Sequence, residues 1–153
     1  MNRRVLFLVC LLILVSVGCN KTEPGVVNAQ DEVDIFLTDM NPELHQTMSK
    51  MRMEIVLADK KIQQLYDLKG MYPDQRDMIN KSIKQWQTLR KQLKFTLNNI
   101  YDKVESAYVA YKIDDIQGRK KFSMISKELL KEGQTVLANA EIVKSTIERE
   151  LYE

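Results

Sequence analysis

The side chains best suited to ligand chemistry follow one another closely after residue 44. His45, the only histidine, precedes Met48 and Met51, and imidazole and thioether groups are ligands that suit Cu(I). On a helix, residues three apart are neighbours, so these side chains could meet. Met48 and Met51 also fit an apolar stripe, and methionine commonly fills gaps in protein cores. Core packing is the favoured interpretation, and a copper site at these residues is the alternative.

No pattern in the sequence predicts catalysis. A single histidine leaves no histidine–carboxylate pair at the spacing of a hydrolase or metalloprotease motif. Serine, threonine and acidic residues are present, but no arrangement of nucleophile and base can be drawn from them. We therefore expect no enzyme activity and no cofactor.

The first nineteen residues have the pattern of an export signal. Arg3 and Arg4 precede an unbroken apolar run over 5–15, and small residues then lead to Cys19. The run is too short for a membrane-spanning helix, which needs about 20 apolar residues. The segment Ser16-Val17-Gly18-Cys19 resembles the lipobox of bacterial lipoproteins, in which the cysteine becomes the first mature residue and carries lipid, including palmitate.

This resemblance implies a signal peptide over 1–18, lipidation at Cys19 and a polar tether over 19–30. It also implies a bacterial cell envelope as the location. Asn20, where aspartate would favour the inner membrane, points to the outer membrane facing the periplasm, with the cell surface as another option. Two other interpretations remain open: ordinary signal-peptidase cleavage after Val27-Asn28-Ala29, and an uncleaved anchor.

Processing at Cys19 would change the charge and the thiol content of the chain. The full sequence has 23 basic and 21 acidic residues, and the segment 1–18 holds two arginines and no acid. A mature chain would therefore be formally neutral, which argues against nucleic acid as a partner. Cys10 would leave with the signal and Cys19 would carry lipid, so no thiol would remain for catalysis.

Apolar spacing predicts an all-α domain over 31–153. Helical stripes cover 31–40, about 42–69, about 73–112 and about 115–151. Asn41-Pro42 fits an N-cap followed by proline in the first turn, Lys69-Gly70 is expected to end a helix, and Gly118 marks a weak point. We expect an elongated, coiled-coil-like antiparallel three-helix bundle with a short N-terminal helical segment. If Pro42 bends the chain without ending the helix, 31–69 matches the other two rods in length.

Charge is divided unevenly between the last two predicted helices. Basic residues dominate the first half of the helix over 73–112, and acidic residues are frequent in the helix over 115–151. Complementary charge on neighbouring helices favours a defined pairing and register. A charged docking face for a partner is the alternative.

A chain tethered at its N-terminus would place the 112–118 turn near the membrane. Arg119, Lys120 and Lys121 follow this turn and could contact anionic headgroups, with Tyr101, Tyr108 and Tyr111 on one helical face toward the same end. A solvated basic turn, with tyrosines that close the bundle core, explains the same residues.

The 69–74 turn and the C-terminus would then lie at the far end. Met71, Tyr72 and Tyr152 are apolar residues with little chain beyond them. Exposed apolar residues of this kind can bind a partner. Local capping of the bundle end is the alternative.

Together these features predict a membrane-anchored lipoprotein of the cell envelope that acts as a helical binding or scaffold module for an envelope protein. Such a module would be an adaptor or an assembly component. The alternatives are a ligand- or metal-binding sensor-like bundle and an inhibitor of an envelope enzyme. Leu130, Leu137 and Ile142 lie off the main stripe of the last helix, which leaves a homo-oligomer open.

Overall fold

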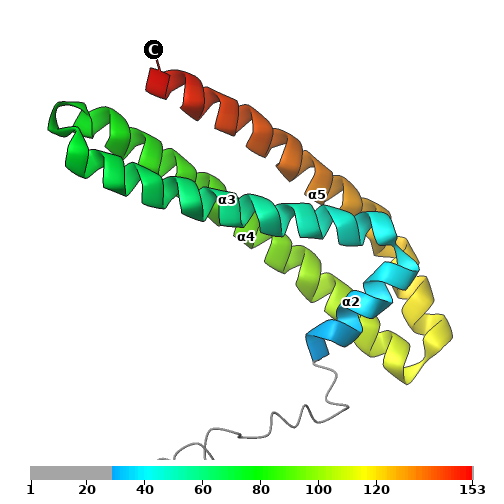
Figure 1. Ribbon diagram of the computed structural model, residues 1–153. Helices are drawn as coiled ribbons and strands as arrows, with labels where there is room; N and C mark the ends of the chain where they lie inside the picture. The colour runs from blue at the N-terminus through cyan, green and yellow to red at the C-terminus, as the bar shows by residue number, and fades with distance from the viewer. Residues whose placement is uncertain (1–28, 153) are drawn as a thin grey trace, which may run out of the picture.

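The computed structural model describes residues 29–152, and this part of the chain is all-α. It contains the helices α2 (Ala29–Met40), α3 (Pro42–Met71), α4 (Arg76–Ile113) and α5 (Asp115–Tyr152), with a short 3₁₀ turn, η1 (Pro73–Gln75), and no strand. The predicted signal peptide over 1–18, Cys19 and the tether up to residue 28 lie outside the described residues. Figure 1 shows α3, α4 and α5 as long rods that lie side by side, with α2 across one end.

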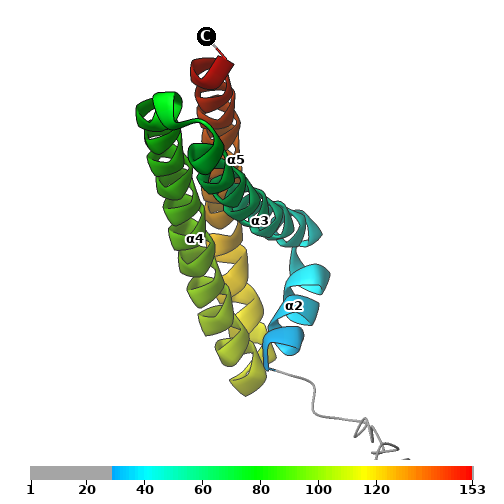
Figure 2. The same ribbon diagram turned by 60° about the vertical axis from the view of Figure 1, so that its left-hand side comes forward.

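The break between α2 and α3 lies at Asn41. Its side chain accepts a hydrogen bond from the Leu44 amide at 2.9 Å, and Pro42 occupies the first turn of α3. This is the predicted N-cap, because the orphan amides of a helix start are satisfied by such a side chain. The single long rod over 31–69 is therefore wrong: α2 ends at Met40 and turns away from α3, as Figure 2 shows.

Pro73, not Gly70, ends the first long helix. α3 continues through Gly70 to Met71, and the Tyr72 amide donates to the Leu68 carbonyl at 2.9 Å. Tyr72 then has extended backbone angles, φ −120° and ψ 77°. A residue before proline is disfavoured in the helical region, so the helix ends immediately before Pro73. The expected stop at Lys69-Gly70 is wrong by two residues, and α4 begins three residues later than predicted.

One residue, Asp114, connects the two longest helices. Its backbone is extended, and its carboxylate accepts a hydrogen bond from the Gln117 amide at 3.1 Å, which caps the start of α5. Gly118 is buried where α5 passes the end of α4. A Cβ atom there would lie 2.1 Å from the Tyr111 Cα atom. Gly118 is thus a site of close backbone approach, where the sequence had indicated a weak point.

Buried apolar side chains from α2, α3, α4 and α5 form one core. Gly133 on α5 lets α3 come close, because a Cβ atom there would lie 2.8 Å from Thr47 Cγ2. Leu130 and Leu137 are half-buried and pack against this core, whereas Ile142 is exposed. The largest fully buried side chains are those of Trp86, Phe122, Leu37, Leu44, Met48, Met51, Leu93, Ile100, Leu129 and Ile147.

Within the described range, no helix has both the length and the apolar character required to cross a membrane.

Candidate functional site

Helix α2 closes one end of the bundle, which we call the base. Phe36 projects from α2 onto Tyr108, Tyr111 and Phe122, with ring centroids 5.5, 5.1 and 5.2 Å away. Ring pairs at these distances contribute beyond the area that they bury. Tyr108 and Tyr111 therefore close the bundle core. This is the second of the two roles that the sequence analysis considered for them, the first being contact with the membrane surface.

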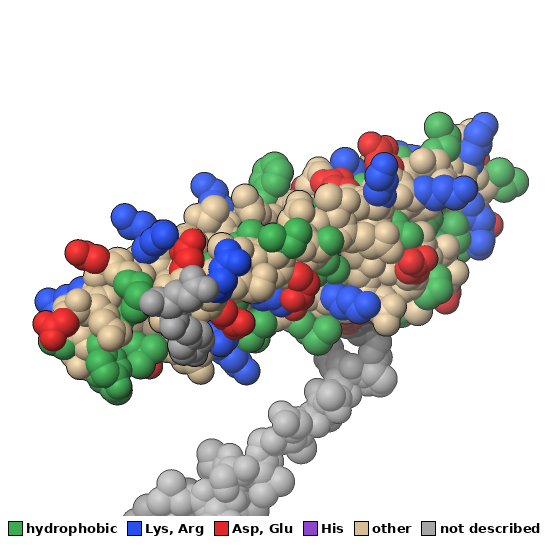
Figure 3. Space-filling model, turned by 90° about the horizontal axis from the view of Figure 1, so that it is seen from above, with side chains coloured by type: hydrophobic (Ala, Val, Ile, Leu, Met, Phe, Trp, Pro, Cys, Tyr) green, Lys and Arg blue, Asp and Glu red, His purple; other side chains and the backbone are tan. Residues whose placement is uncertain are grey.

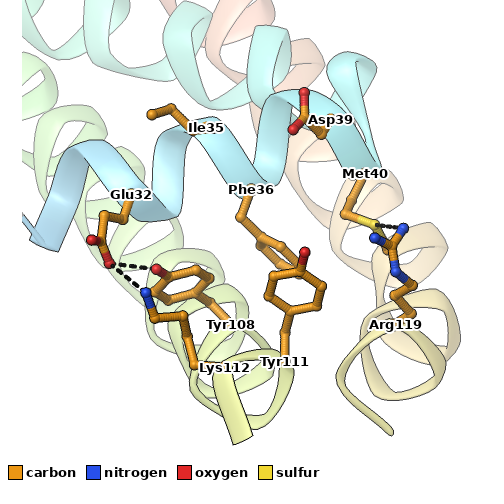
Figure 4. Close-up of a pocket in the computed structure, with 9 residues that line it drawn as sticks. All are labelled: Glu32, Ile35, Phe36, Asp39, Met40, Tyr108, Tyr111, Lys112 and Arg119. Atoms are coloured by element: carbon orange, nitrogen blue, oxygen red, sulfur yellow. Dashed lines mark hydrogen bonds and ion pairs between the residues drawn. The ribbon is translucent and has the colours of Figure 1, made fainter. Parts of the chain in front are cut away.

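A polar cluster holds the start of α2 against the end of α4, as Figure 4 shows. The Tyr108 hydroxyl donates to Glu32 Oε2 at 2.5 Å, and Lys112 Nζ lies 3.4 Å from the same oxygen. The hydrogen bonds from Tyr108 and Lys112 lower the pKa of Glu32, because both groups stabilise the carboxylate. The hydrogen bond to this carboxylate raises the pKa of Tyr108, and the hydrogen bonds with Tyr108 and Glu32 raise the pKa of Lys112.

The end of α2 is held by Arg119 at the start of α5. The guanidinium donates from Nε to Asp115 at 2.6 Å and from Nη1 to the Met40 sulfur at 3.6 Å. It also lies 5.4 Å from the centroid of the Tyr111 ring, at cation–π distance. The hydrogen bond and the charge of Asp115 raise the pKa of Arg119. Arg119 therefore has structural partners on α2, α4 and α5.

The other two members of the predicted basic cluster point elsewhere. Lys121 donates to the Ser106 hydroxyl at 2.9 Å and to the Ser106 carbonyl at 3.3 Å, so it joins α5 to α4. Lys120 is exposed. The structure therefore brings the three basic residues to the base but gives each of them a different neighbourhood.

A shallow cleft of about 280 Å³ remains under α2, between the polar cluster and Arg119. Phe36 and Tyr111 form its apolar floor, and Asp39 lies at its rim (Figure 4). Each cation of the cleft has an acidic partner: Lys112 pairs with Glu32 and Arg119 with Asp115. These side chains are therefore better suited to holding α2 against α4 and α5 than to binding and converting a substrate.

The potential copper ligands do not form an open site. Met48 and Met51 are fully buried in the core, and His45 is half-buried. Among residues 29–152, no group of three or more histidine, cysteine, aspartate or glutamate side chains is placed to hold a metal ion. Core packing accounts for both methionines, because they follow the buried stripe of α3.

The end opposite the base, which we call the tip, contains the α3–α4 turn and the C-terminus (Figure 1). Met71 is 69% exposed and Tyr72 is 51% exposed. Tyr66 and Leu68, which the sequence analysis did not single out, are exposed near the same end. In Figure 3, hydrophobic side chains gather at the end of the molecule with this turn, on the left. The side chain of Tyr152 lies outside the described residues.

Two isoleucines at the base were also missed. Ile113 is the last residue of α4 and Ile116 lies in the first turn of α5, and they are 83% and 78% exposed. A one-residue connection leaves no chain to cover them. The sequence shows these two β-branched residues on either side of Asp114 and Asp115. In the sequence analysis they were treated only as part of the 112–118 turn.

The predicted pairing between basic and acidic helices occurs in part. Lys81 of α4 lies 2.9 Å from Glu150 of α5. Arg90, however, pairs with Asp59 of α3, and Glu148 of α5 pairs with Lys61 of α3. These pairs are exposed and contribute little individually. Charge is therefore distributed over all three helix contacts.

Comparisons with protein-family models, curated proteins and solved structures found no match for this chain.

Proposed function

We propose that the protein is a lipid-anchored scaffold of the bacterial cell envelope. Lipid on Cys19 holds the chain at a membrane, and the outer membrane facing the periplasm is the favoured location. The helices form an elongated antiparallel three-helix bundle, closed by α2, that presents its tip to an envelope protein. The module acts by position, as an adaptor or an assembly component.

The observation that carries this proposal is the separation of the two ends. The described chain enters at the base, and Met71 and Tyr72 are exposed at the opposite end (Figure 1). Helix α4 has 38 residues, so it is about 57 Å long at 1.5 Å per residue. A chain anchored at its start would therefore carry the tip at the far end of a rod of about this length.

The character of the tip and of the bundle favours binding over catalysis. The exposed residues near the tip include two tyrosines and a methionine, which are residue types enriched in protein interfaces. Both cations of the cleft at the base are held in ion pairs, and no nucleophile lies beside a base among its lining residues. A rigid, tightly packed rod is suited to fixing the position of a partner.

Photo-cross-linking in living cells tests the role of the tip. A photoreactive residue replaces Tyr72 in one strain and Phe95 in a matched strain; Phe95 is 74% exposed but lies midway along α4. We expect one dominant protein adduct from position 72, and its loss when Cys19→Ser removes the anchor. An adduct with an envelope enzyme would favour the inhibitor alternative. Adducts from position 95 alone would refute the tip as the binding surface.

A further inference from the structure

The α4–α5 turn exposes apolar side chains where the described chain has nothing beyond them. Ile113 and Ile116 flank Asp114 and Asp115, and Val109, one turn earlier on α4, is also exposed. Other exposed apolar residues, such as Phe95 and Ile142, lie on the faces of the helices, but these two isoleucines project from the extremity of the bundle. An extremity can enter a surface that a helix face would only touch. We call residues 109–121 the base turn.

Basic side chains lie in the same turn as these isoleucines, and Lys121 borders one surface hollow together with Ile113. The base turn has four cations, at Lys112, Arg119, Lys120 and Lys121, and two acids, at Asp114 and Asp115. Lys112 is paired with Glu32 and Arg119 with Asp115, which leaves Lys120 and Lys121 for an anionic surface. Figure 3 shows blue and green side chains together at this end of the molecule, on the right. Lysine and arginine near an anionic bilayer are each attracted by its surface potential, while aliphatic groups partition into the acyl boundary. The two features are complementary to one chemical surface.

We infer that the base turn inserts into the surface of an anionic phospholipid membrane, with Ile113 and Ile116 in the acyl boundary and Lys120 and Lys121 among the phosphates. This inference rests on the proposed lipid anchor for its membrane. Cys19 precedes the start of α2 by ten residues, and covalent geometry limits ten residues to at most about 35 Å. The start of α2 packs against the end of α4, so the base turn stays within reach of the anchor.

The position of α2 decides which residues can take part. Tyr108 and Tyr111 are packed against Phe36, and Arg119 is held by Asp115 and the Met40 sulfur. The aromatic side of the base is therefore covered by α2. The isoleucines lie outside this closure, so insertion requires no opening of the bundle.

The function of such an insertion is to fix the angle of the rod. A lipid on a polar tether leaves a domain free to rotate and to lie flat. A second contact at the base turn would hold the long axis away from the membrane plane. The tip would then face outward at a defined height.

The test uses the full chain reconstituted into phosphatidylcholine vesicles with and without phosphatidylglycerol. Cys10→Ser leaves Gln117→Cys as the one free thiol once Cys19 is acylated, and an environment-sensitive fluorophore is attached there. A second sample carries the label at the tip, at Asp74→Cys; both positions are exposed. We expect a blue shift with quenching by lipid-borne quenchers at position 117 in anionic vesicles, and no shift at position 74.

Matched variants identify the cause of the shift. Ile113→Asp and Ile116→Asp should each move the inserted-to-exposed equilibrium about tenfold, because burying one isoleucine is worth at least a tenfold step. Lys120→Gln should move it about fivefold. The control Phe95→Asp/Ile142→Asp alters two equally apolar, exposed positions away from the base, and should leave the shift unchanged.

The outcomes separate this inference from the anchor. The same measurement is made in a chain that also carries Cys19→Ser, which has one thiol to label whatever the state of Cys19 in the parent chain. A blue shift at position 117 in this variant, together with an unmodified Cys19 in the parent chain, would support insertion of the base turn and reject the lipid anchor. An acylated chain with no shift at position 117 would reject the insertion and retain the anchor. An equal shift in vesicles without phosphatidylglycerol would overturn the requirement for anionic lipid.

Discussion

Replacing Phe36 by alanine should release α2 from the base. Phe36 is 5% exposed and contacts three aromatic rings on α4 and α5. Removing a buried phenylalanine typically costs about 3–5 kcal/mol, through lost transfer free energy and the cavity left behind. The cost to global stability cannot exceed the free energy with which α2 docks, because a more costly cavity would simply detach the helix. Detachment would expose Val33 and Leu37, which lie on the same buried face.

Urea unfolding and hydrogen exchange distinguish a loss of global stability from the detachment of α2 alone. We expect a decrease of about 3 kcal/mol in the free energy of unfolding, or loss of amide protection confined to residues 29–40. Phe95→Ala is the control, because Phe95 is 74% exposed and a surface substitution usually changes stability by less than about 0.5 kcal/mol. A Phe36→Ala protein with wild-type stability and wild-type protection of α2 would refute the account of the base.

Three further predictions concern the core and the polar cluster. Gly133→Ala should destabilise the protein by about 1–3 kcal/mol through contact with Thr47 Cγ2, and Thr47→Ser, which removes that methyl group, should recover much of the loss in urea unfolding. Met48→Leu/Met51→Leu should lower the free energy of unfolding by less than about 1.5 kcal/mol for each residue. Titration with Cu(I) should show no stoichiometric binding to the folded wild type that is absent from the double variant. The pKa of Glu32 is lower in the folded protein than the ordinary 4.5, so its stabilisation is present above that pH and is lost as the pH falls through the folded pKa. Glu32→Gln should therefore reduce the difference in urea midpoint between about pH 7 and about pH 3.

Periodicity predicted the helices because each long segment buries one continuous face. The stripe through Leu44, Met48 and Met51 is fully buried, and Asn41 caps α3 as its residue type indicates. These features are local: a helical face and a cap depend on residues within a few positions of each other.

The helix ends were less predictable because competing local signals act over the same residues. Gly70 and Pro73 both favour termination, and the steric restriction before proline prevailed. Gly118 looked like a weak point, whereas its role is to admit the Tyr111 backbone from the preceding helix. Such a contact depends on how two helices cross, which no single-helix pattern contains.

The base could not be derived from the sequence because it is made by tertiary contacts. Glu32 and Tyr108 are 76 positions apart, and their hydrogen bond exists only because α2 folds back across the end of α4. The basic cluster lies at this end of the bundle, but the partners of Arg119 and Lys121 were not foreseeable from their spacing. The exposure of Ile113 likewise follows from a connection of one residue, where a longer loop had been expected.

Determining the first residue of the mature chain and its modification tests the central claim, the lipid anchor at Cys19, most directly. Intact-mass analysis of the protein purified from bacterial membranes, with an alkyne analogue of palmitate in the growth medium, reports both the first residue and its modification. We predict a chain that starts at Cys19 and carries acyl groups, and a Cys19→Ser variant with no label. An unlabelled chain that starts at Gln30 would show ordinary signal-peptidase cleavage, and an unlabelled chain that retains residues 1–18 would show an uncleaved anchor. Either result would contradict the lipid-anchored scaffold.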